Sequence, residues 1–202
     1  MGPIYISDAK DWGGLYKSTD GGITWNEVVS STFTNEYFWD IEFKPDNANT
    51  MYVGGHRLYK TTNGGTSWTD ITGNLSQYTL TNEIGKYLSI AVPPKNSPSS
   101  ISNTIVIGTI SSTTGNTQIW YSTDGLTTSL NPATSNAGGG ASVYHFSLNL
   151  GAYDNSGTPQ VIIYLGGISF RTSTNSGATF TSVSSSIIHD DIRAIGVPKD
   201  YG

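Results

Sequence analysis

One short pattern recurs four times along this chain of 202 residues, with tens of residues between copies. The first copy, at 18–25, is Ser-Thr-Asp-Gly-Gly-Ile-Thr-Trp, and the second, at 61–68, has Asn in place of Asp. The third copy begins at Ser122 and has lost the Trp, and the fourth begins at Ser173 and has Phe instead. Self-similarity at such a period predicts repeated supersecondary units.

The residue types in this pattern suit a tight turn between two strands. Asp or Asn followed by Gly is a hairpin signal, because the side-chain oxygen accepts hydrogen bonds from N–H groups a few residues on. Glycine supplies a positive φ that a Cβ would oppose, and the aromatic ring then covers the start of the next strand. The residues expected to have these structural roles are Asp20, Gly22, Trp25, Asn63, Gly65, Trp68, Asp124, Asn175, Gly177 and Phe180.

The pattern S/T-x-D-x-G-x-T-W resembles the Asp-box, or BNR repeat, of sialidase-like, xyloglucanase-like and sortilin-like β-propellers and of a photosystem II assembly factor. The preceding segments 14–17 (Gly-Leu-Tyr-Lys) and 57–60 (Arg-Leu-Tyr-Lys) are similar to the third strand of a blade in those families. The resemblance implies an all-β propeller of four-stranded antiparallel blades, each box joining the third and fourth strands at the outer rim. It implies no single function, since those families share the box but not an activity.

Strand patterns between the boxes divide the chain into four expected blades. Three cover residues 36–76, 84–133 and 141–184, and the fourth would combine 188–202 with 3–31. The tail 188–198 has the pattern of the first strand at 37–45, whereas the head begins with a second strand, so the two would complete one sheet. This leaves open a closed four-bladed ring or a segment or half of a larger propeller.

Composition restricts the classes of partner. Charged residues make up 12% of the chain, and Ser, Thr, Asn and Gly dominate its polar positions, as is common in secreted or cell-surface β-proteins. The net charge of −5 disfavours nucleic acid as a partner. The absence of cysteine and of a long apolar run predicts neither disulfides nor a membrane span, and residues 1–3 lack the features of a signal peptide.

First strands of blades line the central channel, and aligning them places polar side chains in two layers. The first layer is Asp40, Ser89, Ser147 and Asp191, and the second is Glu42, Ala91, Asn149 and Arg193. Residues two apart on a strand share a face, so neighbouring carboxylates could bind a cation or raise the pKa of one of them. Asp40, Glu42 and Asp191 are therefore the candidate catalytic residues for glycoside hydrolysis, which needs two carboxyl groups. The sequence favours the alternative, a polar channel in which Arg193 forms one structural ion pair.

Other candidate binding residues are scattered along the chain. Trp12, Trp39 and Trp120 could stack on a sugar or a peptide, although packing between blades is favoured for each. Arg193 and His189 are further candidate binding residues, and His189 could contribute to a metal site, although a cap before a strand is favoured. The histidines lack zinc-type spacing, so no metal or cofactor is expected beyond a structural cation. Three arginines without an Arg-Ile-Pro segment disfavour a sialidase.

Together these patterns favour a non-catalytic, secreted or cell-surface propeller that binds a glycan or protein ligand. One alternative is a fragment of a glycoside hydrolase, either xyloglucanase-like or sialidase-like. The other is a self-assembling structural subunit joined by strand exchange of its ends.

Overall fold

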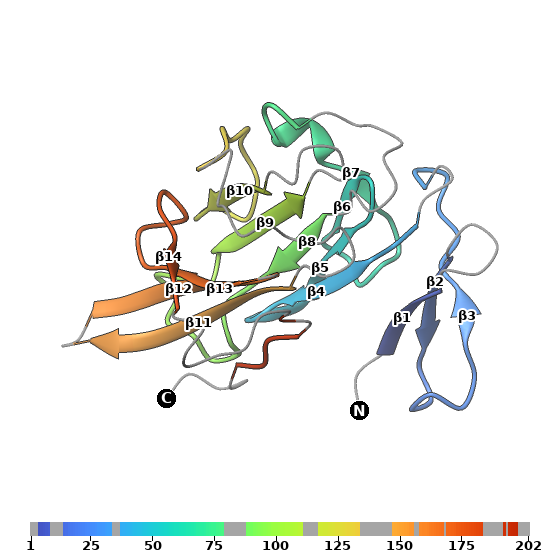
Figure 1. The fold of residues 1–202 in the computed structure, drawn as a ribbon. Coiled ribbons are helices and arrows are strands. Elements are labelled where there is room, and N and C mark those ends of the chain that lie inside the picture. The colour runs from blue at the N-terminus through green and yellow to red at the C-terminus, as the bar shows by residue number, and fades with distance from the viewer. Residues whose placement is uncertain are drawn as a thin grey trace.

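The computed structural model of the chain describes residues 4–8, 14–33, 37–78, 88–110, 117–133, 147–155, 158–167, 169–183, 192 and 194–197. These residues form strands and loops, with one short 3-10 turn, η2 (Thr72–Asn74). Four antiparallel sheets follow one another in chain order (Figure 1). The predicted all-β fold is therefore confirmed, and in the described part of the chain no helix has the length and apolarity needed to cross a membrane.

Each sheet is a meander in which strands adjacent in sequence pair antiparallel. The first sheet contains β1 (Ile4–Asp8), β2 (Gly14–Ser18) and β3 (Asn26–Glu27). The second contains β4 (Asp40–Lys44), β5 (Asn47–Gly54), β6 (Leu58–Thr61) and β7 (Thr69–Asp70). The third contains β8 (Ser89–Ala91), β9 (Ile105–Ile110) and β10 (Thr117–Ser122). The fourth contains β11 (Ser147–Asn155), β12 (Thr158–Gly166), β13 (Phe170–Ser173) and β14 (Thr181–Ser182).

The repeated pattern forms the same hydrogen-bonded turn in all four sheets. In the first copy, the Ser18 hydroxyl donates to Asp20 Oδ1 at 2.8 Å and accepts from the Gly22 N–H at 2.8 Å. Asp20 also accepts from the N–H and the hydroxyl of Thr24, at 2.9 and 2.5 Å. These bonds, with the Thr24 hydroxyl contributing most, lower the pKa of Asp20 to about 2. Matching bonds recur at Asn63, Asp124 and Asn175.

The third copy of the turn differs at Leu126. The preceding glycine and Leu126 both have positive φ, and the value for Leu126 is 58° at a position where the three other copies have glycine. A branched side chain is strained in this region, because Cβ approaches the carbonyl oxygen. Leu126 is nevertheless almost completely buried. Its apolar burial therefore offsets the strain of its backbone.

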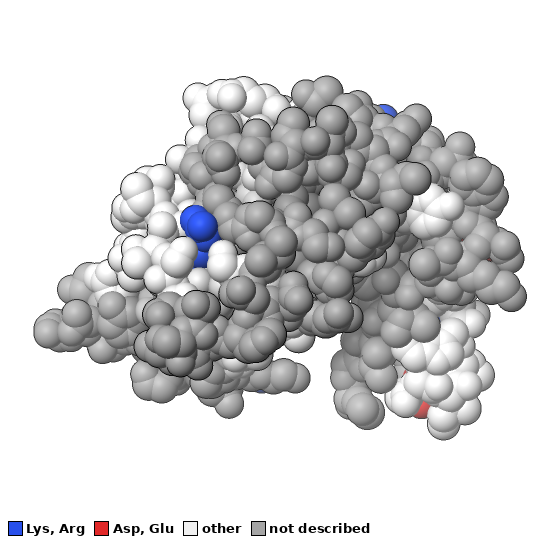
Figure 2. Space-filling view, viewed as in Figure 1, with Lys and Arg blue, Asp and Glu red and all other residues white. Residues whose placement is uncertain are grey.

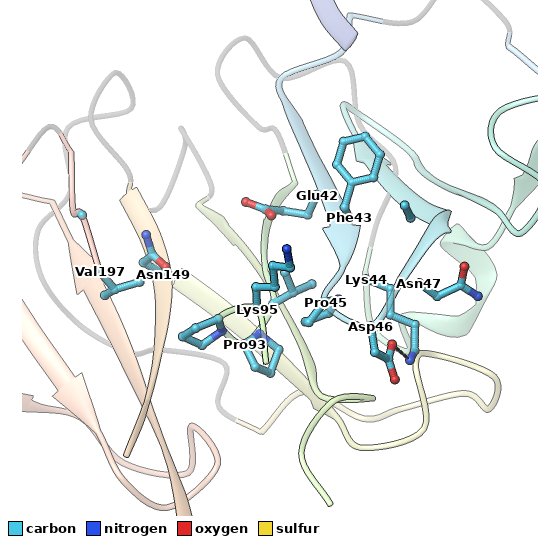
Figure 3. A pocket seen from close by; sticks show the side chains of 14 residues that line it. Glu42, Phe43, Lys44, Pro45, Asp46, Asn47, Pro93, Lys95, Asn149 and Val197 are labelled. Atoms are coloured by element: carbon cyan, nitrogen blue, oxygen red, sulfur yellow. Dashed lines mark hydrogen bonds and ion pairs between the residues drawn. The ribbon is translucent and has the colours of Figure 1, made fainter. Parts of the chain in front are cut away.

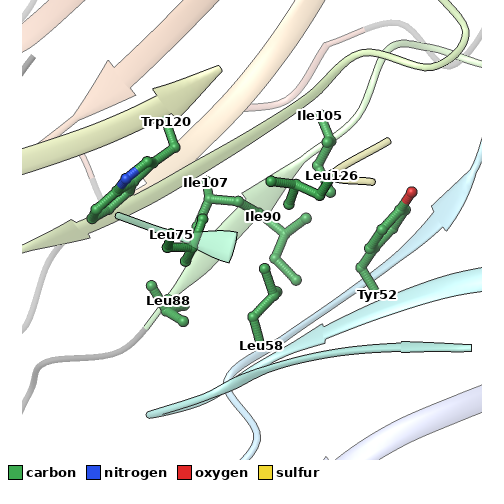
Figure 4. Packing of buried hydrophobic residues seen from close by; sticks show 9 residues of the cluster. All are labelled: Tyr52, Leu58, Leu75, Leu88, Ile90, Ile105, Ile107, Trp120 and Leu126. Atoms are coloured by element: carbon green, nitrogen blue, oxygen red, sulfur yellow. The ribbon is translucent and has the colours of Figure 1, made fainter. Parts of the chain in front are cut away.

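Among the described residues, three hydrophobic cores lie between successive sheets. Tyr52 faces the core shared by the second and third sheets, while its neighbours Met51 and Val53 face the core shared with the first sheet, as the two-residue period of a strand requires. The core between the second and third sheets contains Tyr52, Leu58, Leu75, Leu88, Ile90, Ile105, Ile107, Trp120 and Leu126 (Figure 4). The core between the third and fourth sheets contains Ala91, Val106, Ile119, Leu148, Leu150, Ile163 and Leu165.

The inner strands β4, β8 and β11 contact one another in chain order, and glycines allow this close approach. A Cβ at Gly54 would lie 2.2 Å from the carbonyl oxygen of Leu88, the residue that leads into β8. Gly166 occupies the matching place in the fourth sheet, where a Cβ would lie 2.6 Å from Ile192 of the tail. Successive sheets thus lie closest to one another along their inner strands.

The tail lies beside the fourth sheet. The Ile192 N–H donates to the Gly167 oxygen at 2.8 Å, as the Leu88 N–H does to the Gly55 oxygen at 2.8 Å one sheet boundary earlier. Residues 192 and 194–197 are assigned to no strand, and the first strand expected over 188–198 stays a prediction, because its other residues lie outside the described part of the chain. The sheet expected from residues 188–202 and 3–31 stays a prediction, since most of that tail lies outside the described residues.

Candidate functional site

The three described inner strands begin at equivalent positions. Asp40, Ser89 and Ser147 are the first residues of β4, β8 and β11. Their Cα partners are the glycines Gly54, Gly108 and Gly166. The alignment of three first strands made from the sequence therefore agrees with the structure, whereas its fourth members, Asp191 and Arg193, lie outside the described residues.

Asp40 connects two sheets. Its Oδ2 accepts a hydrogen bond of 2.8 Å from the N–H of Ile90, on the edge strand of the next sheet. This bond satisfies a donor that a sheet edge otherwise leaves unpaired. Burial raises the pKa of Asp40 to about 6, and the bonds from backbone N–H groups oppose that rise.

Glu42 lies two residues further along β4, on the same face of the strand as Asp40. Burial raises the pKa of Glu42 to about 8, and the neighbouring charge of Asp40 contributes to the rise. At neutral pH Glu42 is therefore mostly protonated while Asp40 is mostly ionised. Two carboxyl groups in different protonation states are the usual preparation for acid–base chemistry.

Glu42 lines a cavity of about 780 Å³ at the ends of the inner strands (Figure 3). One wall is the end of β4 and its following turn, a second is the loop after β8, and a third comes from β11 and the tail. The lining residues used below are Glu42, Lys44, Asp46, Pro93, Lys95 and Val197. Figure 3 shows that Glu42, from β4, and Lys95, from the loop after β8, point into the same space.

Asp46 is the second carboxyl group of the cavity. Its carboxylate forms an ion pair with Lys44. The hydrogen bond from Lys44 is the main cause that lowers the pKa of Asp46. The cavity therefore contains one carboxyl group that holds its proton at neutral pH and another that is ionised.

The tryptophans named from the sequence have different environments. Trp120 is fully buried, and its indole N–H donates to the Ser76 oxygen at 3.0 Å, so it offers no ring to a ligand. It belongs to the core because its strand is covered on both faces. Trp39 is 54% exposed at the start of β4, and Trp12 and His189 lie outside the described residues.

Asn149, also expected from the sequence to line the channel, makes hydrogen bonds that connect the backbone. Its amide donates to the Ile195 oxygen at 2.9 Å and its own oxygen accepts from the Leu150 N–H at 2.8 Å. No cluster of three metal-ligating side chains exists among the residues that the structure describes. Charged atoms are sparse over the described residues on the face shown in Figure 2, in keeping with the low charge content.

Asp46 and Lys95 are not among the site residues predicted from the sequence. Both lie on the segments that follow first strands, where Lys44-Pro45 and Val92-Pro93 occupy corresponding places. The recurrence of proline after two of the first strands, Pro45 after β4 and Pro93 shortly after β8, was the available signal. It marks the points where the chain leaves the inner strands and lines the cavity.

Antiparallel meanders packed face to face around their inner strands define a β-propeller architecture. Solved structures share this fold. The chain aligns with an ancestral GH74 enzyme at a TM-score of 0.58 and 23% identity, covering 89% of this chain and 22% of that one. It aligns with the GH74 enzyme of Niastella koreensis at a TM-score of 0.56 and 21% identity, covering 90% and 28% of the two chains.

A solved structure outside the GH74 enzymes also shares this fold. YCF48 from Cyanidioschyzon merolae aligns at a TM-score of 0.53 and 13% identity, covering 78% of this chain and 42% of that one. At these identities the likeness concerns the fold, and the chain spans less than half the length of each of these structures. No protein-family model matches the sequence, and no curated protein matches it either.

Proposed function

We propose that this chain is part of a propeller that acts on glycans, with Glu42 as the proton donor of a glycoside hydrolase-like site. The observation that carries the proposal is a carboxyl group with a pKa of about 8 that lines the same cavity as a second, ionised carboxyl group. The fold shared with GH74 enzymes supports it. The low charge content supports an exported location.

Each carboxyl group has a separate part in this proposal. Protonated Glu42 donates its proton to the leaving glycosidic oxygen, as a general acid with a raised pKa does. Ionised Asp46, in the same cavity, is the group that stabilises the developing positive charge on the sugar or activates water. Asp40 acts through Glu42, because its negative charge raises the pKa of Glu42 and so maintains the proton.

Release of reducing sugar from a panel of plant and microbial polysaccharides tests the proposal. Glu42→Gln should lower kcat by about 10²–10⁴, the usual contribution of general acid catalysis. Asp40→Asn should keep activity but move the alkaline limit of kcat/KM from near pH 8 to lower pH, because removing the charge lowers the pKa of Glu42. A merely structural role for Asp40 would change the rate without moving that limit.

The matched control is Glu27→Gln, a carboxylate on exposed β3. It should leave both the rate and the pH profile unchanged. Full turnover in Glu42→Gln would contradict the proposal, and circular dichroism of each variant separates loss of chemistry from loss of fold.

A second candidate function is glycan or protein binding without catalysis. It is favoured by the second-layer residues of the other two described inner strands, Ala91 and Asn149, of which one is apolar and the other is used in backbone hydrogen bonds. Binding of a polysaccharide by wild type with no turnover, and the same affinity in Glu42→Gln, would establish this alternative. The self-association expected of the chain ends stays a prediction, which the mass in solution with and without residues 188–202 would test.

A further inference from the structure

We propose that the cavity selects acidic glycans and that Lys95 recognises the negative charge of the sugar. This inference rests on the proposed function, because it takes the cavity as a saccharide site. It adds the chemical class of the ligand, which neither the fold nor the carboxyl groups define.

The charges that line the cavity leave one cation uncompensated. Four charged residues contribute, namely Glu42, Lys44, Asp46 and Lys95. Lys44 and Asp46 neutralise each other in their ion pair. Glu42 is mostly uncharged at neutral pH because of its raised pKa. Among the described residues, Lys95 has no ion pair and no side-chain hydrogen bond, so its ammonium group is the charge of the described lining that no other lining residue compensates.

The backbone fixes the place of Lys95. It follows Pro93 and Pro94, which are both buried and whose rings restrict φ. The Pro94 oxygen accepts hydrogen bonds from the N–H and the hydroxyl of Ser97, at 3.2 and 2.7 Å, and so closes a turn around Lys95. The charged group is therefore presented from an ordered turn.

The surroundings strengthen an attraction between Lys95 and an anion. Val92, Pro93 and Val197 make the walls beside it apolar, and such walls lower the effective dielectric constant for a bound charge. Apolar walls also suit the C–H faces of a sugar ring, while protonated Glu42 can donate to a sugar oxygen. Because the whole chain has a net charge of −5, its long-range field repels anions, and selectivity must come from this local cation.

The negative group on the sugar can be a carboxylate or a sulfate, since an ammonium group binds either as a point charge. Isothermal titration calorimetry at pH 7 with trigalacturonic acid, a sulfated galactotriose and neutral galactotriose separates these sources. Wild type should bind at least one acidic trisaccharide about ten-fold more tightly than the neutral one, the scale of one hydrogen bond to a charged group.

Variants at Lys95 test the residue itself. Lys95→Met should reduce the preference for the acidic sugar to within about two-fold, whereas Lys95→Arg should keep it, since the charge is retained. Lys17→Met is the control, because it changes the net charge equally but lies on β2 and does not line the cavity. It should bind both sugars as wild type does.

Three results would overturn the inference: equal affinity of wild type for acidic and neutral sugars, an unchanged preference in Lys95→Met, or no binding of any of the three. Hydrolysis of a neutral polysaccharide that Glu42→Gln abolishes would then leave the proposed function intact. Conversely, acid-selective binding that Lys95→Met removes, without turnover of any glycan, would support the inference and refute hydrolysis.

Discussion

Replacing Glu42 by Gln should stabilise the protein at alkaline pH. Burial, followed by the charge of Asp40, raises the pKa of Glu42 from 4.5 to about 8 in the folded protein. Unfolding returns the carboxyl group to its ordinary pKa, so the unfolded chain loses its proton first as the pH rises. The free energy of unfolding of wild type therefore falls as the pH rises from 4.5 to about 8. The stability that the protonated carboxyl group provides is complete below pH 4.5 and is lost above about pH 8.

The size of this effect follows from the same interval. At about 1.4 kcal/mol for each pH unit, the rise from 4.5 to about 8 corresponds to roughly 5 kcal/mol at the alkaline limit. Gln keeps the shape of the side chain but cannot ionise, so Glu42→Gln escapes this loss. The loss due to Asp40, between pH 3.8 and about 6, remains in both proteins.

Urea unfolding at pH 4.5, 7 and 9.5 measures the difference. Glu42→Gln should match wild type at pH 4.5 and exceed it increasingly at the two higher values, while the exposed control Glu27→Gln follows wild type throughout. If wild type and Glu42→Gln lose stability in parallel between pH 5 and 9, the carboxyl group is not buried in its neutral form. The reasoning about its role as a proton donor would then fail as well.

Three further substitutions test the packing and the turns. Gly54→Ala should lower the free energy of unfolding by about 2–4 kcal/mol, because its Cβ meets the backbone oxygen of Leu88, whereas Gly73→Ala, with open space around it, should change it little in the same urea titration. Leu126→Ala should destabilise by about 2–5 kcal/mol, and Leu126→Gly by about 1 kcal/mol less despite its smaller side chain, because only glycine relieves the positive φ; equal values would refute the strain. Asp20→Asn should preserve the melting temperature at pH 7 and remove the part of the acid destabilisation that appears as the pH falls from 3.8 through about 2; a lower melting temperature at pH 7 would show that the charge itself is required.

The sequence predicts the turns and the sheets well, because both are local. The hydrogen bonds around Asp20 and Asn63 involve residues within four positions of each other, so a short pattern contains all their partners. The inner strands can be predicted equally well, since the two-residue period of a strand places Asp40 and Glu42 on one face. Even the substitution of glycine by Leu126 leaves the turn intact, although its compensation by burial depends on contacts made far away in the sequence.

The candidate site is harder to predict from the sequence, because residues of three sheets contribute to it. Asp40 and Glu42 are found from the alignment of first strands, but the cavity depends on how the segments after β4, β8 and β11 converge. Lys95 belongs to a Pro/Ser-rich loop with no catalytic pattern of its own. For Trp120 the sequence predicts too much, because an aromatic ring is a candidate for binding a ligand. Its burial depends on tertiary packing against both faces of its strand, which the sequence does not reveal.

Each hydrophobic core of this protein is shared by two neighbouring sheets alone. Energetic coupling in such an arrangement passes from one sheet to the next, as in a linear stack of repeats. A whole sheet could therefore be duplicated or deleted during evolution with new contacts needed at only one boundary, so that rings of different circumference can be assembled from one kind of unit.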